Sequence, residues 1–100
     1  MNSDDFLGLL YKKGFPQPSL VKHEGGKFLD FQSHPLELLA LVIEGQVDIT
    51  IDGHRVIYLA GDFFHLPANQ IHSKSFGSKG ASYAMSFRGE FEDSQVTPQT

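Results

Sequence analysis

Residues 38–53 read LLALVIEGQVDITIDG, and this stretch decides the fold. Its first half, residues 38–44, is almost entirely apolar, which is typical of a strand buried on both faces. Its second half, residues 46–51, alternates apolar and polar side chains, which is typical of a strand with one face on a core. We expect Gly45 to end the first strand, and Asp52-Gly53 predicts a tight hairpin turn after the second. The stretch therefore predicts two consecutive strands of an antiparallel sheet.

Further strands are expected on both sides of this stretch. A hairpin turn is expected at residues 24–27 and a connecting loop at residues 77–80. Aromatic and β-branched residues are common between the turns, which favours strands. Many short strands at close spacing predict an all-β domain, built as an antiparallel sandwich or barrel. The other expected strands cover residues 20–23, 27–33, 54–59, 63–66, 71–76 and 81–87.

The two ends of the chain depart from this pattern. Residues 1–19 predict a short helix over residues 3–13, with Ser3 as its N-cap, and then a proline-containing linker. We expect the apolar stripe of this helix to pack on the outside of the domain or to act as an exchange arm in a dimer. Residues 89–100 are polar and acidic and are expected to form a loose tail. A single domain is therefore expected over residues 20–88.

The composition argues against several classes of function. The chain has 100 residues, no cysteine and a formal net charge of −4. Without cysteine there is no disulfide and no thiolate site, and the acidic balance argues against a nucleic-acid surface. The sequence contains neither an apolar run long enough to span a membrane nor the basic start of a signal peptide. We therefore expect a cytoplasmic protein with no nucleic-acid partner and no membrane partner.

A first motif with metal-ligand side chains runs from Gly26 to Gly45. Gly26 is followed after five residues by Gln32-Ser33-His34, and Glu37 comes shortly afterwards. Gln32 and His34 are two residues apart, so on a regular strand their side chains point to the same face of the sheet. The motif therefore predicts a polar cluster on one face of a strand.

A second motif runs from Gly61 to His72. Pro67 follows Gly61 after five residues, and His72 ends the motif. In this order and at these spacings, the two motifs resemble those of the cupins, which are small double-stranded β-helix (jelly-roll) barrels. The resemblance covers about residues 20–88. It implies the cupin fold, and it implies that His34 and His72 meet from different strands.

The resemblance also implies a mononuclear divalent metal inside the barrel. In metal-binding cupins, two histidines and a glutamate of the first motif join the histidine of the second around Fe, Mn, Ni, Zn or Cu. In this sequence Gln32 replaces a histidine, and Glu37 comes one residue early, so that Leu38 takes the glutamate position. The alternative is a barrel without metal whose former ligands bind a ligand, or one another through water. The expected metal ligands are His34, His72, Gln32 and Glu37.

Other side chains are expected to line the cavity around this site. Asp30 shares a face with Gln32 if their strand is regular, and His65 either caps the site or lies outside it. His23 and His54 fall at strand ends and are expected to be exposed. Ordinary core packing is the alternative for most of the aromatic residues. The expected lining residues are Phe28, Asp30, Phe64, His65, Phe76, Tyr83 and Met85.

Two classes of function remain open from the sequence. The first is a metal-dependent enzyme that acts on a small organic substrate, with the dioxygenase or isomerase-like chemistry that the resemblance implies. The second is a non-enzymatic barrel that binds or senses a small ligand with a degraded metal site. We expect a small-molecule partner and a homodimer in both cases. The sequence contains no cysteine nucleophile, G-x-S-x-G elbow or phosphate loop that points to another catalytic scheme.

Overall fold

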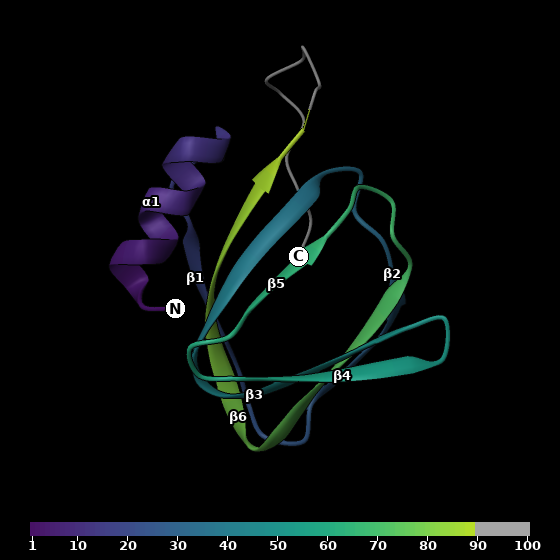
Figure 1. Cartoon of the computed structure of the whole chain (residues 1–100). Helices are drawn as coiled ribbons and strands as arrows, with labels where there is room; N and C mark the ends of the chain where they lie inside the picture. The colour runs from purple at the N-terminus through teal and green to yellow at the C-terminus, as the bar shows by residue number, and fades with distance from the viewer. Residues whose placement is uncertain (90–100) are drawn as a thin grey trace.

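The computed structural model describes residues 1–89 and consists of strands apart from one N-terminal helix (Figure 1). All strand pairs are antiparallel, which confirms the all-β class. Residues 90–100, the greater part of the predicted tail, lie outside the described residues. The elements are α1 (Ser3–Lys13), β1 (Ser19–His23), β2 (Phe28–Gln32), β3 (Glu37–Ile51), β4 (His54–Leu59), β5 (Phe63–Leu66) and β6 (His72–Arg88).

Two long strands, β3 and β6, form the spine of the barrel. The start of β3 pairs with the end of β6, and the end of β3 pairs with the start of β6. The first of these halves is extended by β1 and β5, and we call the resulting four strands the first layer. The second half is extended by β2 and β4, which complete the second layer. Because β3 and β6 pass from one layer to the other, the sheet folds back on itself as a jelly-roll barrel.

Two glycines allow the spine strands to bend between the layers. Gly45 in β3 has a φ of +82° and Gly80 in β6 has a φ of +80°, a region that glycine enters without steric cost. A Cβ atom on Gly45 would lie 2.1 Å from the carbonyl oxygen of Gly80, so the two strands approach too closely for any side chain. The break expected at Gly45 and the loop expected at residues 77–80 are therefore wrong. Each glycine bends a strand that continues.

The turn at residues 24–27 also differs from the expectation. β1 pairs with residues 81–85 of β6, whereas β2 pairs with residues 72–75 of the same strand. The two strands therefore follow one another along one edge of β6 and do not form a hairpin. The Gly25-Gly26 turn carries the chain from the first layer to the second.

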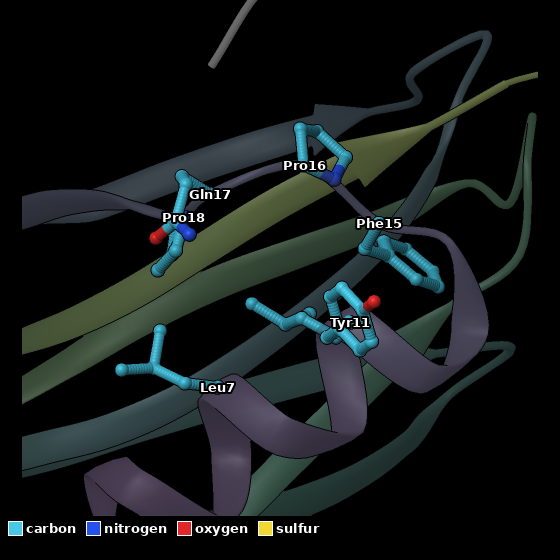
Figure 2. Close-up of a pocket in the computed structure, with 7 residues that line it drawn as sticks. Leu7, Tyr11, Phe15, Pro16, Gln17 and Pro18 are labelled. Carbon is cyan, nitrogen blue, oxygen red and sulfur yellow. The ribbon is translucent and has the colours of Figure 1, made fainter.

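Helix α1 covers the outer face of the first layer. Phe6 and Leu10 are buried against Leu39 and Leu41 of β3, so β3 is buried on both faces here, as predicted. Asn2, and not the expected Ser3, is the N-cap, because its side-chain oxygen accepts a hydrogen bond from the backbone N–H of Asp5 in the first turn. No helix in residues 1–89 is long and apolar enough to cross a membrane. A small cleft between α1 and the linker is lined by Leu7, Leu10, Tyr11, Phe15, Pro16, Gln17 and Pro18 (Figure 2).

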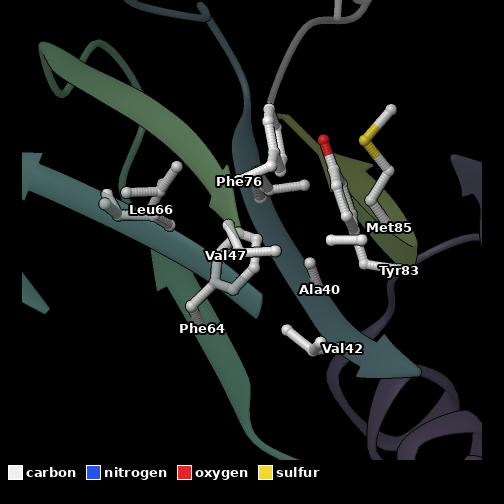
Figure 3. Packing of buried hydrophobic residues seen from close by; sticks show 11 residues of the cluster. Ala40, Val42, Val47, Phe64, Leu66, Phe76, Tyr83 and Met85 are labelled. Atoms are coloured by element: carbon white, nitrogen blue, oxygen red, sulfur yellow. The ribbon is translucent and has the colours of Figure 1, made fainter. Parts of the chain in front are cut away.

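The inner faces of the two layers form the main core (Figure 3). Tyr83 and Phe76 stack with ring planes 7° apart, and Phe64 meets the edge of Tyr83 at a centroid distance of 5.9 Å. Aromatic pairs of this kind stabilise a core beyond the apolar area that they bury. The fully or nearly buried members of the core are Leu38, Ala40, Val42, Val47, Ile49, Phe64, Leu66, Phe76, Ala81, Tyr83 and Met85.

Candidate functional site

The two histidines of the motifs meet inside the barrel, as the resemblance to the cupins implies. The ring centroids of His34 and His72 lie 5.5 Å apart. The rings of His34 and Phe87 pack edge to face with their centroids 5.2 Å apart. Both histidines are buried. Gln32 of β2 is the direct partner of His72 in the antiparallel ladder, so the two side chains point to the same side of the sheet. The structure thus brings together three of the four expected metal ligands.

A bulge in β2 decides which of its side chains point inward. β2 has one residue more than β6 between the pairs Leu29–Lys74 and Gln32–His72. Leu29 and Gln32 therefore both point into the barrel, and the regular alternation that was expected does not hold. Phe28 is 58% exposed and Asp30 is also exposed, so these two predicted lining residues lie on the outer surface. The prediction is wrong for both because the bulge shifts their register.

His72 is held in one orientation by the backbone. Its Nδ1 atom lies 2.9 Å from the carbonyl oxygen of Gln70, so Nδ1 carries the proton and Nε2 presents a lone pair. Nε2 is buried and has no hydrogen-bond partner among the described residues. The Nε2 atom of Gln32 is buried and unpartnered in the same sense. Burial, and to a lesser extent the charge of Lys74, lower the pKa of His72, so the imidazole is neutral near pH 7.

Glu37 does not join the two histidines. Its carboxylate accepts hydrogen bonds from Arg88 and contacts Nε2 of His65 at 2.5 Å, and these bonds lower its pKa. His65 lies outside the cluster with a side chain that is 44% exposed. Leu38 is fully buried, and its ladder partner is Phe87, whose ring contacts His34. Leucine therefore occupies the inward place next to the cluster, and the expectation that Glu37 serves as a ligand is wrong.

A buried lysine that the motifs did not identify lies on the same strand face as His72. Lys74 is only 4% exposed and is directly opposite Leu29 and Ile49, which both pack in the core. Its Nζ atom lies 5.4 Å from the ring centroid of Tyr83 and 5.8 Å from that of Phe64. Burial lowers the pKa of Lys74 to about 8. Two-residue alternation from His72 was the signal in the sequence that points to this lysine.

A third histidine also enters the interior. His23 was expected to be exposed, but it is half-buried and stacks on Phe76 at a centroid distance of 4.4 Å. Its Nε2 atom lies 3.2 Å from the hydroxyl of Tyr83. Burial, followed by the charges of Lys27 and Lys74, lowers the pKa of His23. His54, in contrast, is exposed as expected.

The four remaining predicted lining residues, Phe64, Phe76, Tyr83 and Met85, are all buried in the core. Burial raises the pKa of Tyr83 to about 12, so its hydroxyl stays protonated. A cleft of about 280 Å³ opens beside this region along β4. Lys74 is not one of its lining residues, although one wall residue, Ile49, is the ladder partner of that lysine. The cleft is lined by Ile49, Ile51, Asp52, His54, Val56, Tyr58, His65 and Leu66.

Comparison with known families agrees with this architecture. The model of the cupin domain matches residues 20–83. The chain belongs to the cupin family. The match covers both motifs. Of the inward-facing residues described above, only those at the end of β6, after residue 83, lie beyond it. No curated protein matches this cupin.

Solved structures share the fold of this cupin at low sequence identity. A protein of unknown function from Rhizobium leguminosarum bv. viciae 3841 has a TM-score of 0.69 and 18% identity over 73% of this chain and 69% of its own. A cupin superfamily protein from Desulfitobacterium hafniense DCB-2 has a TM-score of 0.64 and 22% identity over 73% and 67%. The DMSP lyase DddQ from Ruegeria pomeroyi DSS-3 has a TM-score of 0.67 and 21% identity over 80% of this chain and only 40% of its own. At these identities the likeness shows the fold alone.

Cupins often bind a metal, so the donor set of this chain is the test of whether one fits. No three His, Cys, Asp or Glu side chains within residues 1–89 converge as metal ligands would. Gln32, a neutral amide, is the only further donor of the motif beside the two imidazoles, because Glu37 is bound to Arg88. The ammonium of Lys74, two residues from His72 on the same face, repels a second cation. The residues present do not fit a tightly held divalent ion.

Proposed function

We propose that this cupin binds a small organic molecule inside its barrel, without a resident metal. The observation that carries the proposal is the pair of unpartnered polar atoms, Nε2 of Gln32 and Nε2 of His72. Buried polar atoms in folded proteins nearly always have a hydrogen-bond partner, and an unmade bond costs about 1–3 kcal/mol. Two such atoms on directly paired residues indicate a site whose partner comes from outside the chain.

The chemistry of the two atoms describes one end of the ligand. Gln32 offers an N–H donor, and His72 offers a lone pair, because the proton of its ring is on Nδ1. A hydroxyl group satisfies both, since it donates to His72 and accepts from Gln32. Rotation of the Gln32 amide by half a turn presents its oxygen instead, so a donor-only group is also accommodated. The site therefore selects for a polar group of the ligand but not for a charged one at this position.

A metal centre on His34, His72 and Gln32 is the competing function, and one observation favours it. The Nδ1–H of His72 donates to a backbone carbonyl while Nε2 points elsewhere, which is how histidine ligands of metals are held in other proteins. The organic ligand is preferred because leucine takes the place of the expected carboxylate and a buried ammonium lies nearby. A metal-dependent enzyme would require this competing function.

A fragment screen on the purified protein tests the proposal. The protein is treated with a chelator, and binding of small polar fragments is followed by side-chain ¹⁵N shifts. Ligands that bind are expected to shift the Nε2 signals of both Gln32 and His72. The variant Gln32→Leu is expected to weaken these ligands at least ~10-fold, since one charge-neutral hydrogen bond to a buried site is lost. Gln17→Leu, on the exposed linker, is the matched control and is expected to change nothing.

Two outcomes of this screen count against the proposal. The first is the absence of any fragment that shifts His72 in the metal-free protein. The second is binding that is unchanged in Gln32→Leu, because the ligand then lies elsewhere.

A homodimer remains a separate prediction for this cupin. A gel-filtration mass near the 11.1 kDa of one chain would contradict it.

A further inference from the structure

We propose that the ligand is a small organic carboxylate whose oxygen atoms bind the ammonium of Lys74. This inference rests on the proposed function and identifies the class of molecule. Lys74 lies two residues from His72 on the same strand, and both side chains point into the barrel. A strand advances about 3.3 Å per residue, so the two residues are about 7 Å apart along β6. One ligand of modest length therefore reaches both.

Lys74 has no counter-charge among the described residues. No carboxylate within residues 1–89 forms an ion pair with Lys74. Glu37 pairs with Arg88 and His65. Asp48 pairs with Arg55, and its ladder partner is Ser75, the residue after Lys74, so it faces the other side of the sheet. Among the described residues, the inward-facing side of β6 thus carries a positive charge and no negative one.

The ammonium of Lys74 is costly to bury, because a charge moved out of water without a partner loses its hydration. The rings of Tyr83 and Phe64 lie within cation–π distance of Nζ, but such contacts return only part of that cost. An anion at the ammonium offsets the rest of the cost, since charge-assisted hydrogen bonds are about twice as strong as neutral ones. The site is therefore built for a ligand that supplies the missing negative charge.

The surroundings of the ammonium favour an aromatic body for the ligand. The side chains around Nζ are the aromatic rings of Tyr83 and Phe64, and Phe76 stacks on Tyr83. Aromatic walls favour a flat apolar body through offset or edge contacts. Gln32 and His72 provide neutral polar contacts at the far end. A planar carboxylate with a hydroxyl group opposite its acid group matches all three features.

The experiment compares acids with their neutral amides. Dissociation constants at pH 7 are measured by calorimetry for the pairs acetate and acetamide, benzoate and benzamide, and 4-hydroxybenzoate and 4-hydroxybenzamide. For the wild-type protein the acid of at least one pair is expected to bind ~10-fold or more tightly than its amide. Lys74→Met, which keeps the length of the side chain, is expected to abolish this preference, and Lys74→Arg is expected to retain it. Lys79→Met, at an exposed position of the same strand, is the matched control.

The outcomes separate this inference from the proposed function. If fragments shift Gln32 and His72 but no acid binds more tightly than its amide, the carboxylate is ruled out and the proposed function stands. If acids are preferred equally by wild type and Lys74→Met, another residue holds them and the inference is wrong. If no compound in either experiment binds, both proposals fail. Should Lys74→Met not fold, Lys74→Gln replaces it and is likewise expected to lose the preference for acids.

Discussion

Two groups of polar residues in this cupin differ in how completely the protein satisfies them. Glu37, Arg88 and His65 form one group, in which Arg88 also donates to the backbone carbonyl of Lys13 and covers the ring of Phe15. Every charge in this group has a partner in the chain. This group therefore contributes to structure, because it ties the end of β6 to the start of β3 and to the end of α1.

The second group, formed by Gln32, His72 and Lys74, lies in the barrel interior and lacks such partners. Two of its nitrogen atoms have no hydrogen-bond partner among the described residues, and its ammonium forms no ion pair there. These groups are costly to bury, and their cost falls when a ligand binds. The difference supports the proposal that a ligand binds where the fold leaves polar groups unpaired. Glu37 was expected in the interior site although it comes one residue early in the motif, where Leu38 takes the glutamate position.

The strongest test of the comparison is to remove the buried charge. Lys74→Met is expected to stabilise the ligand-free protein by about 3 kcal/mol at pH 7, since burial lowers the pKa of Lys74 from 10.5 to about 8 and a change of one pKa unit corresponds to about 1.4 kcal/mol. Chemical denaturation measures this difference. Lys79→Met is the exposed control and is expected to shift the free energy of unfolding by less than about 0.5 kcal/mol.

The difference in stability between wild type and Lys74→Met is expected to depend on pH. The pKa of Lys74 is lower in the folded than in the unfolded chain, so between pH 8 and 10.5 the unfolded chain binds more protons. Stability therefore rises with pH across this window in the wild type relative to Lys74→Met, and the advantage of the variant shrinks. A constant difference between the two proteins from pH 7 to pH 10 would show that the charge is not buried.

A smaller effect is expected when the buried amide is removed. Gln32→Leu is expected to stabilise the ligand-free protein by about 1–3 kcal/mol, because it removes a buried donor that has no partner in the described chain. The same variant is expected to lose ligand affinity, so stability and binding change in opposite directions. Thermal or chemical denaturation in the absence of ligand gives the first quantity. A loss of stability would mean that the amide already has a partner.

The smallest effect is expected in the satisfied group. Glu37→Gln is expected to lower stability at pH 7 by about 1 kcal/mol or less, as for partly exposed ion pairs. The pKa of Glu37 is lowered in the folded state by its bond to Arg88, so the stabilisation is present above the unfolded pKa and is lost as pH falls below 4.5. Denaturation of wild type and variant at pH 7 and pH 4 measures both. Glu37→Gln is expected to leave ligand binding at pH 7 unchanged. A large loss of binding in this variant would show that Glu37 contributes to the binding site.

Much of the fold can be predicted from the sequence, and the predictions that were wrong share a physical cause. Alternation and turn residues predicted the strands, and the resemblance to the cupin motifs implied that His34 and His72 meet. Gly45 and Gly80 were interpreted as breaks, because a local pattern does not distinguish a glycine that ends a strand from one that bends it against a close neighbour. Only the pairing of β3 with β6 shows that the strands continue.

The site was harder to predict because it depends on register. The bulge in β2 adds one residue, which moves Phe28 and Asp30 to the outside. Lys74 was overlooked because lysine in a strand is usually exposed, although its spacing from His72 placed it on the inward face. His23 was assigned to the surface from its position at a strand end. Each of these residues required the partner strand to be known.

The metal content of the purified protein distinguishes an interior site for an organic ligand from a site with a resident metal. We propose that the interior polar groups bind an organic ligand and hold no resident metal. Protein from cells grown with added Fe, Mn, Ni and Zn, analysed for all four elements, is predicted to contain far less than one metal ion per chain. About one equivalent of a single metal, lost in His34→Ala and His72→Ala but retained in His54→Ala, would contradict the account.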